Sequence, residues 1–204
     1  MKLYVTPGSP YGRMARIVVL EKSLEERVEV ILARTRTPGS PYYEINPSGR
    51  VPYLQLDDGS GLEESGLICW YLDHLDGAPA FDPPPGLAGL ETRRLEAMAR
   101  SLLDGISLWG REYLYRAPEI RSETIIAHER SRAFRLVASL EGRMDSPALA
   151  EPLDMAQLTL ACALHWRSET PPGFAWRDGA PQLAGWVDRI GTRPSLQATL
   201  APPR

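Results

Sequence analysis

Ser9 is the first residue of the chain whose type and position could do chemistry. It opens a Ser-Pro-Tyr-Gly-Arg run at residues 9–13, between a strand-like segment, Lys2–Thr6, and an apolar helical pattern that begins at Pro10. Backbone amides and a hydroxyl at the start of a helix favour an anion. A thiol bound there would be more acidic, because the helix dipole and a donated hydrogen bond both stabilise the thiolate. The same pair is also an ordinary helix start, with Ser9 as the N-cap.

A second candidate site is Val51-Pro52, at the entrance to a strand-like segment that ends at Leu56. This position suits a cis peptide bond, which would turn the backbone N–H and C=O of Val51 sideways. An extended peptide could then pair with Val51 as one more antiparallel strand would. The alternative is an edge-strand proline that only prevents aggregation.

A third candidate is the Glu-Glu-Ser-Gly run at residues 63–66, in front of an apolar helix. The Ser65 hydroxyl and free amides could bind a carboxylate, and Glu64 could bind an ammonium group beside it. An α-amino acid would be held in this way. The alternative is that Ser65 is an ordinary helix cap and the two glutamates are helix-start acids.

The sequence pattern around these three sites predicts an α/β domain over residues 1–76. Strands are expected at residues 2–6, 28–32 and 51–56, with a short strand element at 62–63. Helices are expected from Pro10 and over residues 67–75. The first two strands and the helix between them form a βαβ unit, so its strands should pair in parallel. The β-branched strand at 28–32 should be largely buried, and Ser65 should cap the last helix, which stops near Gly77.

The rest of the chain predicts a linker and an all-helical domain. Residues 77–89 are rich in proline and glycine, a composition that neither continues a helix nor pairs into a sheet. Residues 90–204 have helical periodicity, with further helices at 153–166 and 181–190. The apolar stripes are Leu95, Ala99, Leu102, Ile106, Trp109 and Tyr113, and Ile126, Ala133, Val137, Leu140 and Met144. A helical bundle is expected.

The composition of the chain argues against several classes of partner. The chain has 204 residues and a net charge of -3 with interspersed charges, which argues against a nucleic-acid partner. No apolar run could span a bilayer and no signal-peptide core is present, so we expect a cytoplasmic protein with no membrane partner. Cys69 and Cys162 should be buried small hydrophobes without a disulfide, and no metal site is expected.

The three candidate sites, in this order and followed by a Pro-rich linker and a helical domain, resemble the glutathione transferase superfamily. The resemblance covers essentially the whole chain and is closest to small bacterial members. It implies a thioredoxin-like first domain and glutathione as co-substrate, with no metal. Ser9 would donate to the glutathione sulfur, and Val51 would pair with the cysteinyl backbone. Pro52 would be the family's cis-proline. The γ-glutamyl end would be held by Glu64 and Ser65. Arg50, or more weakly Arg36, would lie near the glycine carboxylate.

The resemblance also implies a reaction class. Relatives with serine at the sulfur favour conjugation, isomerisation or peroxide reduction, as in detoxification, whereas a glutaredoxin-like thiol reductase would need cysteine in place of Ser9. Tyr4 and Tyr11 are rivals for the sulfur, with core packing and a pocket wall as their alternative roles. A homodimer is implied, and so is an alternative: a non-catalytic glutathione-binding or protein-interaction protein with the same fold.

A second substrate, a small hydrophobic or anionic electrophile, would lie between the domains, against the first long helix of the bundle. The candidate residues are Tyr11, Trp109, Arg111 and Tyr113, with Tyr115 nearby. An aromatic stripe of this spacing also suits core packing or a dimer contact. One departure from the family pattern is Glu151, where a hydroxyl residue usually caps the helix. Asp154 could still bond back toward that helix start.

Overall fold

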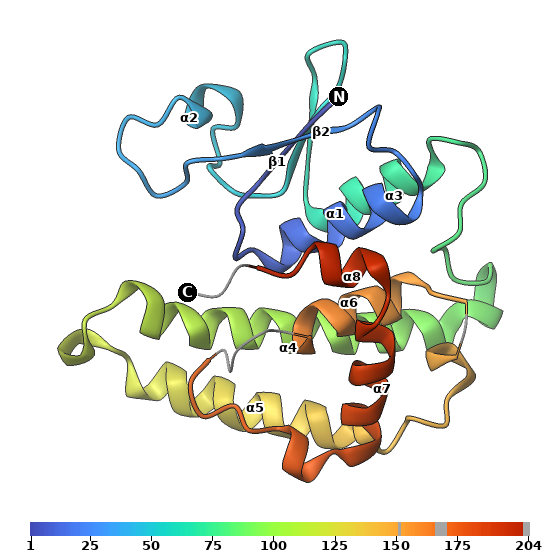
Figure 1. Cartoon of the computed structure of the whole chain (residues 1–204). Helices are drawn as coiled ribbons and strands as arrows, with labels where there is room; N and C mark the ends of the chain where they lie inside the picture. The colour runs from blue at the N-terminus through green and yellow to red at the C-terminus, as the bar shows by residue number, and fades with distance from the viewer. Residues whose placement is uncertain (151, 166–170, 202–204) are drawn as a thin grey trace. The chain divides into compact units, whose positions relative to one another are not determined.

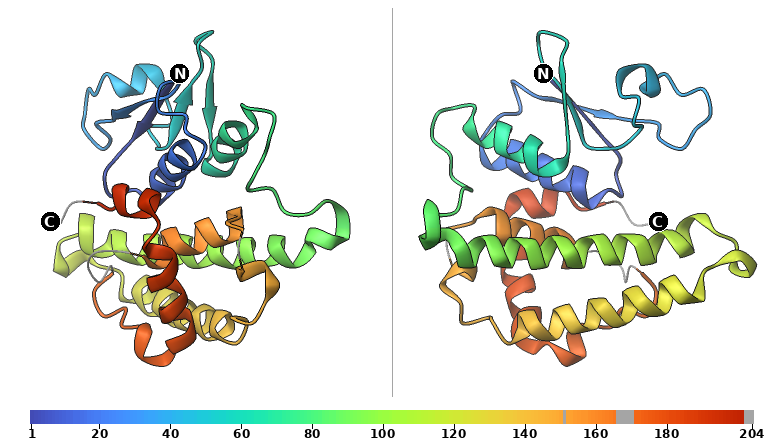
Figure 2. Two further views of the ribbon diagram at one scale, coloured as in Figure 1. Left: turned by 45° about the vertical axis from the view of Figure 1, so that its right-hand side comes forward. Right: turned by 180° about the vertical axis from the view of Figure 1, so that it is seen from behind.

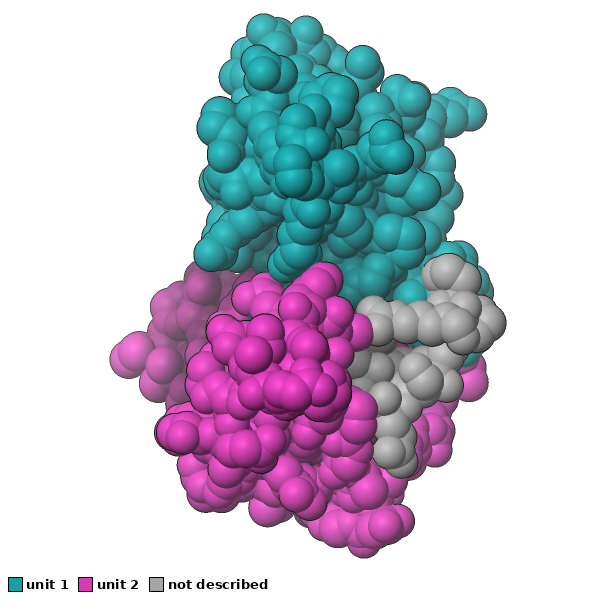
Figure 3. Space-filling model, turned by 90° about the vertical axis from the view of Figure 1, so that its left-hand side faces the viewer, with its two compact units in different colours: residues 1–82, 194–202, 204 teal, residues 83–193, 203 magenta. Residues whose placement is uncertain are grey.

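A computed structural model gives the structure of the chain and describes residues 1–150, 152–165 and 171–201 (Figure 1). Contacts divide the chain into two compact units, residues 1–82 with 194–201, and residues 83–193 (Figure 3). The first unit is a four-stranded sheet with helices, and the second is helical. The predicted fold class, a thioredoxin-like domain followed by a helical bundle, is confirmed. No helix in the described ranges has the length and apolar character needed to cross a membrane.

The sheet of the first unit mixes parallel and antiparallel pairs. Its strands are β1 (Lys2–Val5), β2 (Glu29–Leu32), β3 (Tyr53–Gln55) and β4 (Gly61–Glu63). Their order is β2-β1-β3-β4, with β1 parallel to β2 and β3 antiparallel to both β1 and β4. Helix α1 (Pro10–Glu21) connects the two parallel strands, so the predicted βαβ unit is present.

Strand β2 lies at the edge of the sheet, so the prediction that it is largely buried is wrong. Val30 and Leu32 are 43% and 67% exposed. Pairing on one side only leaves both of them partly open to solvent. β-Branched residues suit any pleated, partly covered strand, so their presence does not distinguish an edge strand from a central one.

Helices α1 and α3 (Ser65–His74) pack together against one face of the sheet (Figures 1 and 2). Apolar residues recur in α1 at three- and four-residue spacing, which gives the helix one face to bury. Fully buried residues at this interface are Leu3, Val5, Met14, Ile17, Val18, Leu54, Ile68 and Leu72. A four-residue helix, α2 (Tyr42–Ile45), was not predicted, because one turn is too short to show periodicity.

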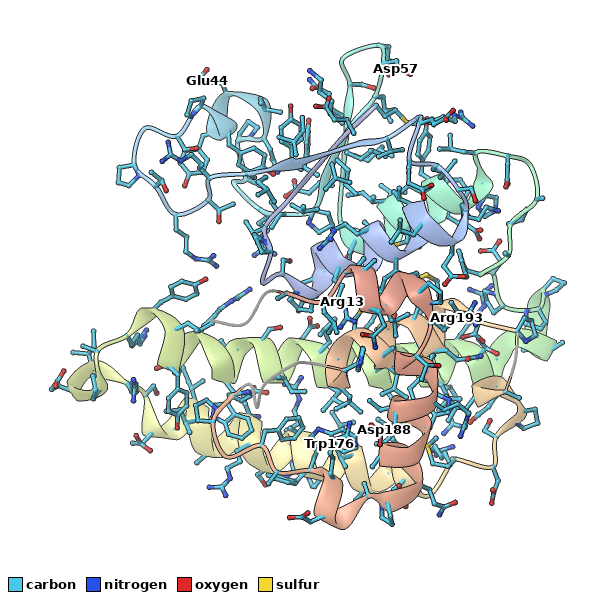
Figure 4. The ribbon with its side chains drawn as sticks, in the orientation of Figure 1. Arg13, Glu44, Asp57, Trp176, Asp188 and Arg193 are labelled. Carbon is cyan, nitrogen blue, oxygen red and sulfur yellow. The ribbon has the colours of Figure 1, made fainter. Side chains whose placement is uncertain are left out.

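The C-terminal helix α8 (Pro194–Ala198) packs on α1 within the first unit. Arg13 of α1 is 3% exposed and donates to the Leu196 carbonyl at 2.9 Å and to the Thr199 hydroxyl at 3.2 Å (Figure 4). The last carbonyls of a helix need such donors. The C-terminal residues therefore contact the first unit, whereas the sequence pattern places them in the helical domain.

The second unit is built on four longer helices. They are α4 (Leu90–Tyr115), α5 (Glu123–Glu141), α6 (Met155–Leu164) and α7 (Pro181–Gly191), with the short 3-10 helices η1 (Gly86–Gly89), η2 (Pro118–Ile120), η3 (Pro147–Leu149) and η4 (Arg177–Gly179). Helix α4 packs along α5 and α6, and its predicted stripe is buried from Leu95 to Trp109 (Figure 2). Every residue from Ala156 to Leu164 is buried, as expected for a helix that is apolar on all sides.

Asp154 is the N-cap of α6, and its carboxylate accepts the Gln157 N–H at 2.9 Å. The prediction that Asp154 bonds back toward the helix start is wrong, because Asp154 is itself the cap and its bond runs forward, to the third residue of the helix. Glu151 lies outside the described residues. Cys69 and Cys162 are both buried and neither forms a disulfide, as predicted.

Candidate functional site

Backbone pairing brings three distant segments of the sequence to one edge of the sheet. Tyr4 of β1 pairs with Tyr53 of β3, which also pairs with Glu63 of β4. At this edge the chain leaves β1 toward Ser9, enters β3 from the Val-Pro pair and leaves β4 toward Glu64. The residues just beyond the paired rows therefore lie together, as a shared site requires.

Ser9 is the N-cap of α1. Its hydroxyl oxygen accepts the N–H of Gly12 at 3.1 Å, and its carbonyl accepts the N–H of Arg13 at 2.9 Å. Within the described ranges, no acceptor is recorded for the hydroxyl proton of Ser9. A hydroxyl has one proton to donate and two lone pairs. Ser9 can therefore cap the helix and still donate to an anion at the positive end of the helix dipole.

The peptide bond between Val51 and Pro52 is cis, as predicted. Val51 is half-buried. In the part of the chain that the structure describes, no hydrogen bond is recorded to its backbone N–H or C=O. Backbone N–H and C=O groups normally form hydrogen bonds, so an extended ligand at this edge could pair with both groups of Val51.

The loop before the cis bond is fixed by two buried side chains. Asn46 is 2% exposed and donates to the Arg50 carbonyl at 3.0 Å, and the Tyr42 hydroxyl donates to the same oxygen. Burial raises the pKa of Tyr42, so its phenol stays protonated as a donor. Gly49 has a φ of 65°, and a Cβ there would come within 2.8 Å of the Tyr43 ring. This turn therefore requires glycine.

The two arginines expected near a ligand carboxylate are both exposed. The guanidinium of Arg50 has no bonding partner among the residues described, so its charge is available to an anion. Arg36 lies in the loop after β2 with a φ of 54°. Of the two, Arg50 is the one directly joined to Val51.

Helix α3 is capped by Glu64, so the prediction that Ser65 is its cap is wrong. The Glu64 carboxylate accepts the N–H groups of Gly66 at 2.8 Å and Leu67 at 3.3 Å. Ser65 is the first helical residue, and its hydroxyl donates to Glu64 at 3.1 Å. The amides expected to be free are therefore occupied. Glu64 is exposed and has a φ of 82°, and strained backbone of this kind concentrates at ligand sites.

The two tyrosines that rival Ser9 differ in their surroundings. Tyr4 is 7% exposed, and its ring centroid lies 5.5 Å from that of Tyr42 and 6.4 Å from that of Tyr53. Its surroundings are those of a packed core aromatic. Tyr11 is half-buried in the first turn of α1.

The residues expected beside a second substrate also differ. Trp109 is 1% exposed and packs edge-on against Phe174 at 5.7 Å, which fits the core-packing alternative. Arg111 is exposed and Tyr113 is half-buried. The guanidinium carbon of Arg121 lies 4.6 Å from the centroid of the Tyr113 ring. Sequence patterns did not predict Arg121, because it lies between helices, where no periodicity marks a face.

One cluster in the described part of the chain has metal-type donors, Asp73, His74 and Asp82, within 4.8 Å of one another. Asp73 already accepts two backbone N–H groups at 2.9 and 3.0 Å and pairs with Lys22 at 3.3 Å. Its oxygens therefore join α3 to α1 and to the segment after α3.

Two surface hollows lie in the first unit. One, of about 640 Å³, is lined by Lys2, Gln55 and Asp57 at the opposite ends of the paired strands. The other, of about 180 Å³, is lined by Tyr4, Leu32 and residues of α2.

Comparison with known proteins identifies both halves of the chain. The models of the glutathione S-transferase N-terminal and C-terminal domains match residues 8–75 and 123–189. A glutathione transferase family member from Pseudomonas fluorescens Pf-5, crystallised with bound glutathione, is 32% identical with a TM-score of 0.87 over 99% of each chain. Its complex with S-(propanoic acid)-glutathione gives a TM-score of 0.85 at 32% identity over 100% of each chain.

A curated relative is YibF of Escherichia coli K12, an uncharacterized GST-like protein that is 28% identical over 203 residues, 99% of each chain. The similarity to the Pseudomonas protein extends over nearly the whole of both chains. The chain therefore belongs to the glutathione transferase superfamily.

Proposed function

We propose that the chain is an enzyme that binds glutathione at the edge of the sheet marked by Ser9, Val51 and Glu64 and ionises its thiol. The observation that carries the proposal is the register of β1, β3 and β4, which brings these three segments together. The Pseudomonas relative was crystallised with glutathione, which supports the same ligand here.

Each part of the tripeptide has a counterpart at this edge. The exposed Glu64 carboxylate binds the γ-glutamyl ammonium, with Ser65 beside it. The unpaired backbone of Val51 takes the cysteinyl backbone as an added strand. Arg50, or secondarily Arg36, binds the glycine carboxylate. The sulfur then meets the Ser9 hydroxyl.

Catalysis follows from this placement. The Ser9 hydroxyl donates to the sulfur, and together with the α1 dipole it favours thiolate, so the thiol proton passes to solvent. The thiolate attacks an electrophilic carbon, and a C–S bond forms as the leaving group departs with its electron pair. A peroxide oxygen is the alternative target. The second substrate is a small hydrophobic or anionic electrophile, and Tyr11, half-buried in the first turn of α1, contacts it.

The test is the pKa of bound glutathione, followed by thiolate absorbance in the wild-type protein and in Ser9→Ala. A hydrogen bond to a charged group contributes about 1.5–3 kcal/mol. Its loss should raise the pKa of the bound thiol by about one to two pH units. Ser122→Ala is the matched control, because Ser122 caps α5 with the same kind of bond, to the Ile125 N–H at 3.3 Å.

An ordinary thiol pKa in the wild-type complex would end the thiol-activation mechanism. Tight glutathione binding without turnover of any electrophile or hydroperoxide in a broad panel would instead favour the non-catalytic alternative.

We also propose that the protein is a homodimer. Leu67 and Trp70, three residues apart on α3, are 45% and 50% exposed. Such apolar surface on one helix face suits a protein interface. A monomeric mass in sedimentation equilibrium at micromolar concentration would contradict the proposal.

A further inference from the structure

The peptide unit between Arg50 and Val51 contains the backbone N–H that the proposed ligand would meet. Val51-Pro52 is the one cis bond recorded among the described residues, so the bond between Arg50 and Val51 is trans. A trans peptide unit is planar, and its C=O and N–H point in opposite directions. The direction of the Arg50 carbonyl therefore sets the direction of the Val51 N–H.

Two buried donors hold the Arg50 carbonyl. Asn46, 2% exposed, donates from Nδ2 at 3.0 Å, and the hydroxyl of Tyr42, 4% exposed, donates to the same oxygen. A carbonyl oxygen has two lone pairs, so it can accept both bonds at once. The Val51 N–H therefore points away from both donors, and no partner for it is recorded in the described ranges.

The orientation of the Asn46 amide is itself fixed. Its Oδ1 accepts the Ser48 N–H at 3.1 Å, so Nδ2 is the atom that faces the Arg50 carbonyl. If the peptide unit turned over, the Val51 N–H would face Nδ2, and this buried donor would lose its carbonyl acceptor. Loss of a buried hydrogen bond is costly. The amide therefore favours the orientation that leaves the Val51 N–H open to a ligand.

The ring of Tyr42 is held separately from its hydroxyl. Its centroid lies 5.5 Å from that of Tyr4 and 6.4 Å from that of Tyr43. The backbone N–H of Tyr42 donates to the Ser40 hydroxyl at 3.3 Å. None of these contacts uses the Tyr42 hydroxyl. Phenylalanine at this position should therefore keep the packing and remove only the donor.

We propose that Tyr42 is a positioning residue. Together with Asn46, it holds the Arg50 carbonyl so that the Val51 N–H points at the cysteinyl carbonyl of bound glutathione. The inference rests on the proposed function, because it requires glutathione to pair with the Val51 backbone as an added strand. A donor that is already oriented loses less freedom on binding, so the Tyr42 hydroxyl increases affinity without contacting the ligand.

The test is Tyr42→Phe, with two ligands measured by calorimetry. One is glutathione, and the other is an analogue in which a methylene group replaces the cysteinyl carbonyl, so that the Val51 N–H has no acceptor. The Kd of glutathione should rise about three- to tenfold, the range for one neutral hydrogen bond. The Kd of the analogue should change by less than about twofold, because it does not use the oriented N–H.

Tyr43→Phe is the matched control, since it is the same substitution at the next residue of α2. The Tyr43 hydroxyl accepts the Thr37 N–H at 3.2 Å instead. This variant should leave the Kd of both ligands within about twofold of the wild-type values.

A purely structural role of the Tyr42 hydroxyl would weaken both ligands alike, and that result would overturn the proposal. An unchanged Kd for glutathione would overturn it too, as would the same selective loss in Tyr43→Phe. The pKa of the bound thiol in the wild-type protein tests the proposed function separately. An ordinary thiol pKa rejects thiol activation, while the two ligands still decide the role of Tyr42. Absence of glutathione binding to the wild-type protein overturns both.

Discussion

At the scale of single residues, the site depends on how each polar group divides its hydrogen-bonding capacity. The Ser9 hydroxyl oxygen accepts the N–H of Gly12, which leaves the hydroxyl proton for donation to a ligand. The Glu64 carboxylate accepts the N–H groups of Gly66 and Leu67 and the Ser65 hydroxyl, and its negative charge remains exposed. The two caps are thus complementary in what they leave open, because Ser9 keeps a donor, which would face the sulfur in the proposed complex, and Glu64 keeps a negative charge, which would face the ammonium group.

The substitution Glu64→Gln tests whether the charge of Glu64 has a role apart from its hydrogen bonds as a helix cap. Glutamine keeps an acceptor for the Gly66 N–H, so the free energy of unfolding should change by less than about 0.5 kcal/mol. The charge is lost, so the Kd for glutathione should rise about tenfold, as for a charge-assisted hydrogen bond. Calorimetry measures both the wild-type protein and the variant. Glu63→Gln is the matched control, because Glu63 bonds to the Ser48 hydroxyl instead.

A glutathione analogue without the α-amino group sharpens the result. Its affinity should be the same for the wild-type protein and for Glu64→Gln. An equal loss of affinity for glutathione and for the analogue would show that Glu64 acts on the fold of the site and not on the ammonium group.

Local sequence preference accounts for part of the site. Serine before proline predicts the Ser9 cap, and the Val-Pro pair at a strand entrance predicts the cis bond. The same preference fails at Ser65, because Glu64 takes the cap with a φ of 82° that residue type does not signal. Arg13 contacts Thr199 across 186 positions, and no local pattern encodes such a pairing.

At the scale of elements, the end of α8 is held by the start of α1. Besides Arg13, Arg16 donates to the carbonyls of Thr199 and Ala198, each at 3.4 Å. The Ser195 hydroxyl donates to Glu21 at the other end of α1. The helix that carries Ser9 at its N-cap is therefore braced along its length by the C-terminal residues.

Arg13→Met should lower the free energy of unfolding by about 2–3 kcal/mol, because it leaves buried acceptors without donors. Urea denaturation measures the loss. Arg16→Met is the comparison, since the hydrogen bonds of Arg16 are longer and one of them is exposed, and the loss of stability should stay below about 1 kcal/mol. Equal losses in the two variants would show that burial of Arg13 contributes nothing beyond a surface bond.

The N-cap of α6 gives a pH dependence of known sign. Burial raises the pKa of Asp154, while the Gln157 N–H opposes the rise. The folded state therefore holds this proton more tightly than the unfolded chain, so the contribution of Asp154 to stability is complete below its unfolded pKa of about 3.9 and falls as the pH rises through the folded value.

Asp154→Asn removes this titration and keeps a good cap. Relative to wild type, the variant should therefore gain stability as the pH rises from 4 to 7. Asp154→Ala should be about 1 kcal/mol less stable than Asp154→Asn at every pH, because both lack the titration and only Ala lacks the cap. Thermal unfolding at several pH values measures both. A difference between wild type and Asp154→Asn that does not vary with pH would contradict the assigned sign.

Periodicity predicts the longer elements and fails for the shortest ones. Helices α4 to α7 and the βαβ unit repeat their apolar residues often enough to be recognised from the sequence. Helix α2 has four residues and α8 has five, too few to show a period. The exposure of β2 depends on which strands flank it, and strand order is a property of the whole sheet.

At the scale of the whole molecule, the chain leaves the first unit after residue 82 and returns to it at residue 194. The first unit is therefore assembled from both ends of the sequence. Folding of the sheet region and docking of the C-terminal residues should be coupled, because α1 contributes to both. Ligand binding at the sheet edge should therefore affect the first unit separately from the helical unit.

Hydrogen exchange with and without glutathione locates that response. A ligand present at about 100 times its Kd stabilises the folded state by about 2.7 kcal/mol. Protection should increase most at residues 9–13, 51–55 and 63–68, where ligand contacts add to the hydrogen bonds of α1, β3 and α3. Glu64→Gln at the same fractional saturation is the comparison, in which protection should rise as before at residues 9–13 and 51–55 and less at residues 63–68. If protection rose mainly within α7 while these segments exchanged as before, glutathione would bind elsewhere, and the sheet edge would lose its assigned role.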